Sequence, residues 1–393
     1  MRRWSDAAGR APRERLRVLI VTDEMEVGGT QRQIVEIACG LDVSAFDVSV
    51  AYFRERSHLV DRLEAAGIRV VHLPKQGRVD PRFLASLVQE LRHGAYDIVH
   101  AFAFSAELWV AVAHLALPGR ARPVLVTSVR GTYEWYAPWQ WQLKRWVSAR
   151  SARIIANSQA GAAHAAQRLR LPVAAIDVIH NGVAEDSAAR GARSRLRGQW
   201  GVHPDAVVAL FVGRLVEVKC VDVLVRAAAL LGAEGRQETV VICGDGPQRE
   251  SLQALARALH VADRVRFLGE RPDVADLIEA ADLVVLPSRH EGLSNVILEA
   301  MRGERPVVAT RTGGNVELVD HGRTGLLVEV GDHRALATAI RQLSDDAPRR
   351  CAMGRRAAER AARNFSRPRM VQAFAAIYRD AVQRPLATIA VAR

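Results

Sequence analysis

The sequence has few of the residues that cross-link secreted domains or hold structural metals. Its 393 residues include four cysteines, with no CxxC pair and no companion cluster of histidines. A scattered set of this kind is typical of a protein from a reducing compartment, and it contains no zinc-site pattern. We therefore expect no structural metal and no cofactor.

Long apolar runs are also missing. The longest, residues 108–118, is interrupted by His114 and is too short to cross a bilayer. Residues 1–15 are basic and lack an apolar core, so we expect a disordered tail rather than a signal peptide. These features predict a cytoplasmic protein, either free or peripheral on the inner face of the plasma membrane.

Acidic residues are fewer than basic ones. The sequence has 43 Asp and Glu and 55 Lys and Arg, which give a formal charge of +12. This charge favours an anionic partner, such as a nucleic acid, a lipid surface or a phosphorylated substrate. The arginines are spread along the whole chain, however, and no zinc finger, homeodomain or RNP-type string occurs. We therefore expect no nucleic-acid partner.

Short β-branched runs that alternate with amphipathic stretches are abundant. One series starts at Val18 and includes RVLIVTD, FDVSVAYF and DIVHAF, and a second starts after residue 200 and includes VVALFVGR, TVVICGDG and ADLVVLPS. This alternation predicts α/β domains with parallel sheets and right-handed crossovers. We expect one domain at 16–184, a second at 185–368, and a last amphipathic segment within 369–393.

The most informative segment is EGLSNVILE, residues 291–299, which follows an apolar run and a Pro287-Ser288 turn and opens an amphipathic helix. Such a helix start presents unpaired N–H groups and the positive end of a dipole, which attract phosphate. Glu291 and Glu299 must recognise something else, and an ionised carboxylate accepts hydrogen bonds from hydroxyl groups. Phosphate flanked by hydroxyl groups describes a nucleotide sugar.

Glycine turns follow other predicted strands. Gly213 and Arg214 follow one strand, and Lys219 comes five residues later, so two cations accompany a turn that suits a diphosphate. Taken alone, these residues are more typical of a solvated basic loop. Gly28-Gly29 precede a helix, and Gly244 lies in a tight turn. These glycines either allow a ligand to approach the backbone closely or have a structural role only.

Taken as an ordered set, these strings resemble the retaining glycosyltransferases of family 4, the group 1 glycosyl transferases. The resemblance extends from residue 16 to residue 380, and its motifs are more specific in the second half. The matching positions are Gly28-Gly29, Asn157-Ser158, Asn181-Gly182-Val183, Gly213-Arg214 with Lys219 and Asp222, Gly244-Asp245-Gly246, Leu268-Gly269, Ala281-Asp282, Glu291 with Glu299, Gly314 with Glu317, and Gly325-Leu326.

The resemblance implies the GT-B architecture. In it, two Rossmann-like domains with parallel sheets face an interdomain cleft, and a C-terminal helix crosses back to the first domain. Residues 369–383 match that helix. The first domain would then hold the acceptor and the second the nucleotide sugar.

The resemblance also implies residue roles. Arg214 and Lys219 would hold the donor diphosphate, Glu299 the nucleotide ribose, and Glu291 the hydroxyl groups of the transferred sugar. Retention of anomeric configuration is implied by the family alone. A front-face route, in which the departing phosphate oxygen takes the acceptor proton, needs no protein nucleophile and makes a metal optional. The implied donor-binding set is Gly28, Gly29, Gly213, Arg214, Lys219, Gly244, Glu291, Gly292, Leu293, Ser294, Asn295 and Glu299.

The chain departs from the family pattern in its first half. Where many members carry a His in a VxxxHG context, this chain has Arg130, which stays protonated at neutral pH and cannot act as a base. We favour binding of a phosphate or an anionic acceptor by Arg130 over loss of activity. His100 is a second cleft candidate, with a packing role as the alternative. The candidate catalytic residues are Glu291, Arg214, Lys219, His100 and Arg130.

Tryptophan is concentrated in one segment, where it is interleaved with basic residues. Such a segment suits an interfacial helix that rests on anionic lipid. A partly buried lid over the acceptor cleft, or ordinary core, are the alternatives. The residues concerned are Trp135, Trp139, Trp141, Trp146, Lys144 and Arg145.

The sequence therefore predicts an enzyme that transfers a hexose-type sugar from a nucleotide-diphosphate sugar to a hydroxyl acceptor with retention. A lipid-linked or saccharide acceptor, in surface polysaccharide or glycolipid assembly, fits this activity. The alternatives are a catalytically silent nucleotide-sugar binding protein and another GT-B enzyme, such as a nucleotide-sugar epimerase.

Overall fold

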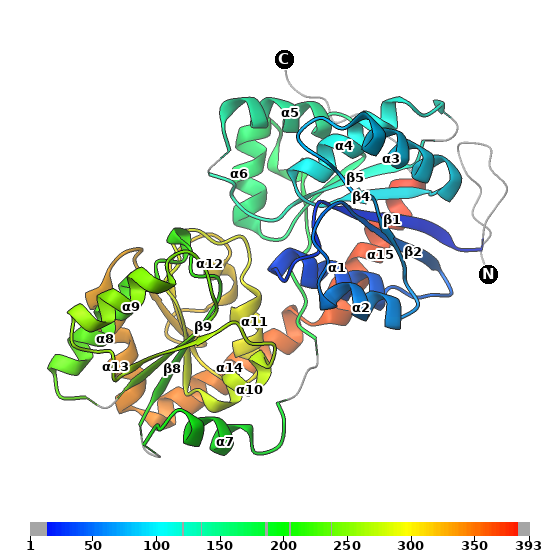
Figure 1. The fold of residues 1–393 in the computed structure, drawn as a ribbon. Coiled ribbons are helices and arrows are strands. Elements are labelled where there is room, and N and C mark those ends of the chain that lie inside the picture. Colours follow the sequence, from blue (N-terminus) through cyan, green and yellow to red (C-terminus); the bar gives the residue numbers. More distant parts are fainter. Residues whose placement is uncertain are drawn as a thin grey trace. The chain divides into compact units, whose positions relative to one another are not determined.

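The computed structural model describes residues 14–119, 122–134, 136–184, 188–203, 206–236 and 238–383. The chain divides into two compact units (Figure 1). Unit 1 contains Met1–Gly182 and Arg367–Arg393, and unit 2 contains Val183–Ser366. Most of the predicted N-terminal tail, and the chain after residue 383, lie outside the described residues.

Unit 1 is built on one parallel sheet of seven strands in the order β3-β2-β1-β4-β5-β6-β7. The order reverses between β1 and β4, which creates the switch point where open α/β sheets bind ligands. The strands are β1 Leu16–Thr22, β2 Phe46–Tyr52, β3 Arg69–His72, β4 Ile98–Ala101, β5 Val124–Val129, β6 Arg153–Ala156 and β7 Asp177–Val178.

The helices of unit 1 cover both faces of this sheet. Helices α1, α2 and α15 share one apolar core, and α3 and α4 share another on the opposite face, as Figure 1 shows. The helices are α1 Gly29–Gly40, α2 His58–Ala65, α3 Pro81–Gly94, α4 Phe104–Leu115, α5 Pro138–Ser148, α6 Gln159–Leu169 and α15 Arg367–Gln383, with a 3₁₀ turn at Val173–Ala175.

Unit 2 repeats the same plan with six parallel strands in the order β10-β9-β8-β11-β12-β13. Its switch point lies between β8 and β11. The strands are β8 Val208–Val212, β9 Thr239–Cys243, β10 Val265–Gly269, β11 Leu283–Leu286, β12 Val307–Thr310 and β13 Gly325–Val328.

Helices α8, α9 and α13 lie on one face of the unit 2 sheet, and α10, α11 and α14 lie on the other (Figure 1). The helices are α7 Ala192–Gln199, α8 Val221–Ala233, α9 Arg249–Ala258, α10 Val274–Ala280, α11 Asn295–Arg302, α12 Asn315–Leu318, α13 His333–Asp345 and α14 Ala347–Asn364, with a 3₁₀ turn at Glu217–Lys219.

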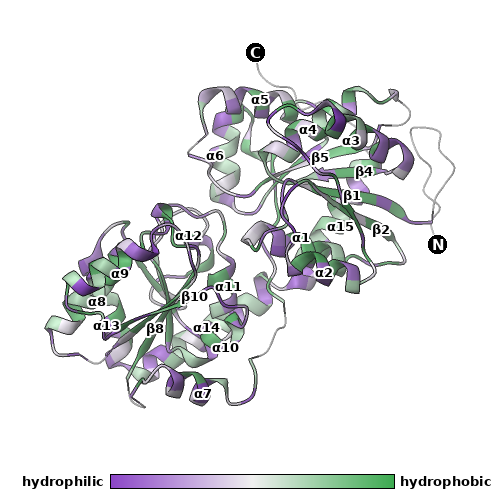
Figure 2. Cartoon of the chain, viewed as in Figure 1, coloured by the Kyte–Doolittle hydropathy of each residue, from purple (hydrophilic) through white to green (hydrophobic). Residues whose placement is uncertain are grey.

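The strands are apolar because both faces of each sheet are covered by helices. Figure 2 shows the hydrophobic residues concentrated in the strands and the hydrophilic residues on the outer surfaces of the helices. Strand β4 and strand β11 are buried along their whole length. The predicted α/β class with two Rossmann-like parallel sheets is thereby confirmed.

Helix α15 belongs to unit 1, although it follows unit 2 in the sequence. Its apolar face, with Phe374 and Tyr378 fully buried, packs into the same core as α1. At its start, the Arg367 guanidinium pairs with the Glu36 carboxylate on α1 at 2.9 Å. The C-terminal helix therefore completes one face of the unit 1 sheet.

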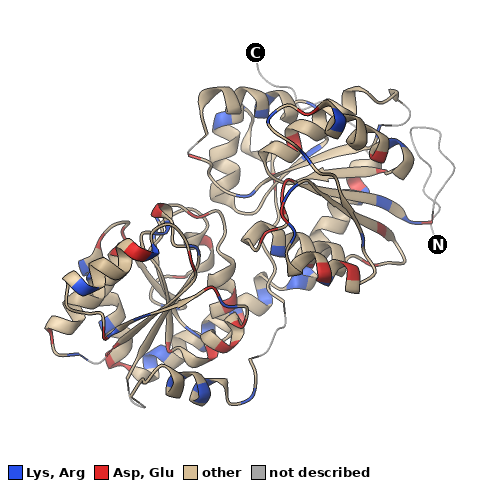
Figure 3. Ribbon diagram, viewed as in Figure 1, with Lys and Arg blue, Asp and Glu red and all other residues tan. Residues whose placement is uncertain are grey.

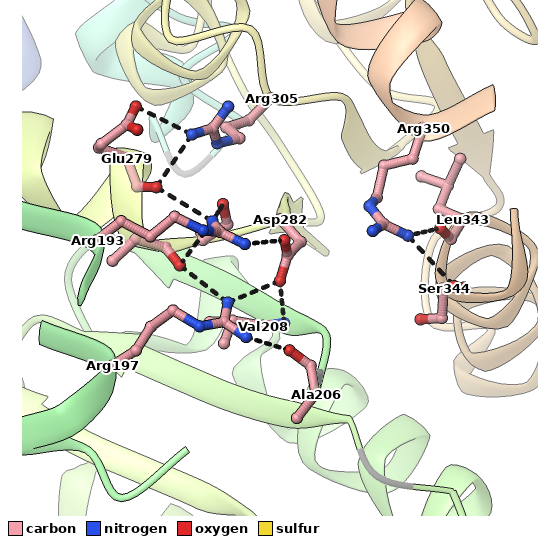
Figure 4. A network of polar contacts seen from close by, with 12 residues as sticks. Arg193, Arg197, Ala206, Val208, Glu279, Asp282, Arg305, Leu343, Ser344 and Arg350 are labelled. Atoms are coloured by element: carbon pink, nitrogen blue, oxygen red, sulfur yellow. Dashed lines mark hydrogen bonds and ion pairs between the residues drawn. The ribbon is translucent and has the colours of Figure 1, made fainter. Parts of the chain in front are cut away.

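A buried carboxylate anchors the first helix of unit 2 to its sheet. Asp282, just before β11, accepts hydrogen bonds from the Val208 N–H at 2.8 Å and from the guanidinium groups of Arg193 at 2.6 Å and Arg197 at 3.0 Å (Figure 4). Burial raises the pKa of Asp282, but these three donors outweigh it and hold the pKa below its usual value. Helix α7 is fixed to β8 and β11 in this way.

A second pair in Figure 4 explains an unusual position in the sequence. Arg305, which precedes Pro306 where the family pattern has a small or apolar residue, donates to the backbone oxygens of Ile278 and Glu279. It also pairs with the Glu279 carboxylate at 2.9 Å. The guanidinium therefore stabilises the C-terminal end of α10.

We predict that Asp282→Asn lowers the free energy of unfolding by about 3 kcal/mol at neutral pH, because Arg197 is left buried without a carboxylate. Urea denaturation measures the change. The folded-state pKa of Asp282 is lowered, so its contribution is complete above the pKa of the unfolded chain and disappears as the pH falls through the lowered pKa. The difference between wild type and variant should therefore shrink in acid.

The matched control is Glu234→Gln, which removes an exposed ion pair with Arg341 and should change the free energy of unfolding by less than about 1 kcal/mol. Equal effects of the two substitutions would contradict the anchoring role of Asp282.

Candidate functional site

An ion pair lies at the carboxyl edge of the unit 2 sheet, across its switch point. Lys219, in the loop after β8, donates from Nζ to Oε1 of Glu291 in the loop after β11, at 2.6 Å. Their side chains are 22% and 10% exposed. The two loops are also joined by the Arg289 N–H, which donates to the Val218 oxygen at 2.8 Å. The sheet thus brings together two residues that are separated by 72 positions in the sequence.

Two glycines, in the loops after β9 and β12, let these loops pack closely on the loops that carry Lys219 and Glu291. A Cβ at Gly244, where φ is +139°, would lie 1.9 Å from the Gly213 oxygen. A Cβ at Gly313, where φ is +47°, would lie 1.8 Å from the Glu291 oxygen. Any side chain at either position would displace the backbone beside Lys219 or Glu291. The structure therefore places Gly213 and Gly244 against each other, and gives Gly313 a role that the sequence did not show.

Helix α11 begins directly beside Glu291. Ser294 is its N-cap and accepts a hydrogen bond from the Ile297 N–H at 3.3 Å. The Gly292 oxygen accepts from the Gly314 N–H at 2.9 Å, which fixes the loop before the cap. The positive end of the helix dipole and the N–H groups of its first turn are thereby held at the same sheet edge as Lys219.

The remaining candidates of unit 2 lie on the same elements. Arg214 lies two residues after the end of β8, is exposed, and its guanidinium makes no ion pair with any residue that the structure describes. Glu299 lies on α11, half-buried, one turn beyond the cap. Unit 2 thus presents two cations, two carboxylates and a helix start along one edge, an arrangement that suits an anionic ligand with hydroxyl groups.

In unit 1, Gly28 is the N-cap of α1 and Gly29 is the first residue of that helix. They follow β1, at the carboxyl edge of the unit 1 sheet. Gly28 has an extended backbone, with φ −145° and ψ 165°, and offers no side-chain cap. Their assignment to the donor stays a prediction.

The prediction that His100 is a cleft residue is wrong. Its side chain is fully buried at the end of β4, with Nδ1 2.7 Å from the Tyr378 hydroxyl and Nε2 2.8 Å from the Ser128 hydroxyl. The ring packs on Phe102 at 4.2 Å between centroids. Burial, and then the charge of Arg130, hold the pKa of His100 well below its usual value, so the ring stays neutral. His100 joins α15 to the sheet and cannot touch a substrate.

Arg130 lies directly after β5, at the carboxyl edge of the same sheet. Its backbone N–H donates to the Tyr133 hydroxyl at 2.8 Å, and its Nη2 donates to Oδ1 of Asn181 at 2.6 Å. Burial lowers the pKa of Arg130 to about 10, which leaves the guanidinium charged at neutral pH. The structure thus presents a cation where the family pattern has a histidine.

Sequence reasoning missed the partners that hold Arg130. Asn181 was matched as part of an Asn-Gly string but received no role, because its contact with Arg130 spans 51 positions. Tyr133 carries no motif, and only its position in the turn after β5 brings its hydroxyl to the backbone of Arg130.

The tryptophan-rich segment forms α5, but its predicted lipid-facing surface is wrong at two positions. Trp141 is 5% exposed and Lys144 only 2%, and the Lys144 ammonium pairs with the buried Glu107 carboxylate on α4. Oε1 of Glu107 also accepts from the Ser128 N–H at 3.2 Å. A buried carboxylate requires a cation, so the lysine points into unit 1 rather than toward a membrane.

The rest of the segment divides by exposure. Trp139 is 57% exposed and packs one edge on Phe104 at 6.2 Å between ring centroids. Arg145 and Trp146 are half-buried, and Trp135 lies outside the described residues. Figure 3 shows Lys and Arg spread over both units with acidic residues among them.

Neither a metal cluster nor a membrane-spanning helix is found in the part of the chain that the structure describes. No three His, Cys, Asp or Glu residues there are grouped to hold a metal ion. No described helix is long and apolar enough to cross a bilayer.

Two family models match the chain, Glycosyltransferase Family 4 over residues 27–187 and Glycosyl transferases group 1 over residues 192–360. The D-inositol 3-phosphate glycosyltransferase of Kineococcus radiotolerans is 32% identical over 412 residues, which cover 91% of this chain and 92% of that protein. The chain belongs to the family 4 glycosyltransferases. The family resemblance seen in the sequence is therefore confirmed.

Other matches to this glycosyltransferase chain cover less. The D-inositol 3-phosphate glycosyltransferase of Corynebacterium kroppenstedtii is 36% identical over 244 residues, 59% of this chain and 54% of that protein. The chain thus spans about half the length of several curated relatives that it matches.

A solved structure supports the GT-B fold over most of the chain. The Anabaena protein HepE, in complex with UDP-glucose, is 27% identical with a TM-score of 0.83. The match covers 93% of this chain and 100% of HepE. The predicted fold class is confirmed by this likeness together with the two parallel sheets.

We predict that Lys144→Met destabilises the protein by about 3–5 kcal/mol, because Glu107 is left buried without a cation. Thermal unfolding measures the loss. The double variant Lys144→Met with Glu107→Leu should recover most of it, since the unpaired charge is gone.

Arg145→Met, at the neighbouring half-buried position, is the matched control and should change stability by about 1 kcal/mol or less. If Lys144→Met is no worse than this control, the ion pair does not anchor α5.

Proposed function

We propose that this chain moves a hexose-type sugar from a nucleotide-diphosphate sugar to a hydroxyl group, with retention at the anomeric carbon. The observation that carries the proposal is the Lys219–Glu291 pair beside the start of α11. It lies in the part of the chain that the group 1 model matches. The UDP-glucose complex of HepE supports a nucleotide-sugar donor, since that protein shares 27% identity with this chain.

In the proposed complex the donor lies along the carboxyl edge of the unit 2 sheet. Arg214 and Lys219 bind the diphosphate, together with the N–H groups of residues 292–295 at the start of α11. Glu299, one turn into α11, accepts from the ribose hydroxyls, and Glu291 accepts from hydroxyls of the sugar. Donor phosphate then replaces Glu291 as the main anionic partner of Lys219, which frees Glu291 for the sugar.

In the proposed transfer the acceptor oxygen bonds to the anomeric carbon as the bond from that carbon to the β-phosphate oxygen breaks. The departing phosphate oxygen takes the proton of the acceptor hydroxyl, on the same face of the sugar. Negative charge grows on the β-phosphate during this step. Arg214, Lys219 and the N–H groups of α11 are already in position to stabilise that charge, which is the largest contribution that such a site makes to rate.

We predict that Lys219→Ala and Glu291→Gln each lower kcat/KM at least about 100-fold, because each removes a group that contacts the reacting part of the donor. Release of nucleoside diphosphate from the sugar nucleotide, with and without acceptor, measures turnover. Circular dichroism and melting temperature confirm that both variants are folded.

Arg341→Gln serves as the control, since it removes a positive charge from an exposed pair on α13. It should leave turnover unchanged. Turnover near the wild-type value in both site variants would refute the donor assignment, whereas donor binding without any turnover in the wild type would favour a catalytically silent binding protein.

The proposed acceptor is lipid-linked or saccharide, as in assembly of surface polysaccharide or glycolipid. Such an acceptor implies a cytoplasmic enzyme that works peripherally on the inner face of the plasma membrane. Exposed Trp139, with Arg145 nearby on α5, is the part of the tryptophan-rich segment that remains available for this contact.

We predict that Trp139→Ser with Arg145→Glu reduces co-sedimentation with vesicles that contain phosphatidylserine, and that added salt reduces wild-type binding. The control pair is Val79→Ser with Arg78→Glu, which changes an exposed apolar residue and an exposed cation elsewhere in unit 1. Equal vesicle binding by wild type and both double variants would exclude a role for α5.

A further inference from the structure

Arg130 differs from the arginines of this chain that pair with a carboxylate in the kind of partner that it has. Arg193 and Arg197 share Asp282, and Arg305 pairs with Glu279. The Arg130 guanidinium has a neutral partner, the Asn181 amide oxygen at 2.6 Å. Among the residues described, no carboxylate forms an ion pair with it. Its charge is therefore balanced by dipoles alone.

Two nitrogens of this guanidinium make no hydrogen bond to the residues that the structure describes. Nε is buried and makes no hydrogen bond, and Nη1 likewise donates to no residue in the described ranges. A buried polar group without a partner is unfavourable, and more so when it is charged. Burial also lowers the pKa of Arg130 to about 10, which reports the same unfavourable environment.

The guanidinium is nevertheless held in one place. The backbone of Arg130 is fixed on both sides, because its N–H donates to the Tyr133 hydroxyl at 2.8 Å and its oxygen accepts from Nδ2 of Asn157 at 3.5 Å. The guanidinium carbon lies 5.8 Å from the centre of the Phe102 ring. A rigid planar fork with unused donors is the arrangement that recognises two oxygens of one anion.

The location is also that of a ligand site. Arg130 directly follows β5, beside β4 at the switch point of the unit 1 sheet, and ligands of open α/β sheets bind outside this edge. We propose that Arg130 binds an oxyanion of the acceptor, so that the acceptor of this chain carries a phosphate or a similar anionic group next to the hydroxyl that receives the sugar. This inference rests on the proposed function, because it names the substrate class for the first unit.

The test compares binding of inorganic phosphate, glycerol 3-phosphate and glycerol to the full chain by calorimetric titration, at constant ionic strength. Wild type should bind both anions and not glycerol. Arg130→Gln should weaken anion binding about tenfold or more, the loss expected for a charged hydrogen-bonded contact, and Arg130→Lys should keep part of it. Arg122→Gln is the matched control, because Arg122 lies just before the same strand and donates to backbone oxygens there.

Stability separates this role from a structural one. Arg130→Gln removes a desolvated cation that has no counter-ion, so its melting temperature should equal or exceed that of wild type. A structural role predicts a lower melting temperature in Arg130→Gln, with anion affinity unchanged once the protein is folded. Equal anion affinity in wild type, Arg130→Gln and Arg122→Gln would overturn the proposal.

Two further measurements on the same preparations complete the design. Binding to vesicles of phosphatidylcholine, with and without phosphatidic acid, shows whether the anion belongs to a lipid or to a soluble molecule. If it belongs to a lipid, Arg130→Gln should lower binding to the vesicles that contain phosphatidic acid. If it belongs to a soluble molecule, Arg130→Gln should lower binding of glycerol 3-phosphate only. Binding of UDP-glucose and release of UDP test the donor site separately. Normal binding of UDP-glucose together with anion binding that does not depend on Arg130 would reject this inference alone. Anion binding that depends on Arg130, without binding of UDP-glucose, would reject the proposed function.

Discussion

The ion pair between Lys219 and Glu291 is the interaction on which the candidate site depends. It joins the loops that follow β8 and β11, the two neighbouring strands at which the order of the unit 2 sheet reverses. The parallel sheet brings the two loops to one edge, where the Arg289 N–H donates to the Val218 oxygen. Gly244 and Gly313 let the loops after β9 and β12 pack closely on either side of them. The start of α11 adds its dipole at the same point. Without this pair, two cations and two carboxylates would be separate features of an ordinary α/β domain.

Each unit balances a buried charge with an ion pair that fastens a helix to its neighbours. In unit 2 the Asp282 carboxylate compensates two arginines, which fastens α7 to the sheet. In unit 1 the Glu107–Lys144 pair does the same for α5. The Asp282 cluster lies at the start of β11, whereas the Glu107–Lys144 pair lies beside the end of β5, where Glu107 accepts from the Ser128 N–H. The Arg130 guanidinium has only a neutral partner, the Asn181 amide oxygen. Lys219 and Glu291 compensate each other in the structure, and we propose that donor phosphate takes the place of Glu291.

Much of the architecture could be predicted from the sequence, because apolar β-branched runs between amphipathic stretches specify a parallel sheet covered on both faces. The grouping of Lys219, Glu291 and the start of α11 at one sheet edge could also be predicted, since they lie in loops that follow strands. The errors concern side-chain direction. His100 was misplaced because a strand residue can point into either layer, and here it points toward Tyr378 on a helix from the far end of the chain. Lys144 was misplaced because a lysine is normally exposed, and its buried partner on α4 carried no motif.

The central claim is that the carboxyl edge of unit 2 binds a nucleotide-diphosphate sugar, and the melting temperature of the wild-type chain in UDP-, GDP- and ADP-sugars tests it most directly. A ligand that binds the native state raises stability in proportion to the logarithm of its concentration, by about 2.7 kcal/mol at a hundred times its Kd. The account predicts a concentration-dependent rise with the sugars of one base and a smaller rise with the others. No rise with any of the three, at concentrations where UDP-glucose stabilises HepE in the same assay, would contradict it.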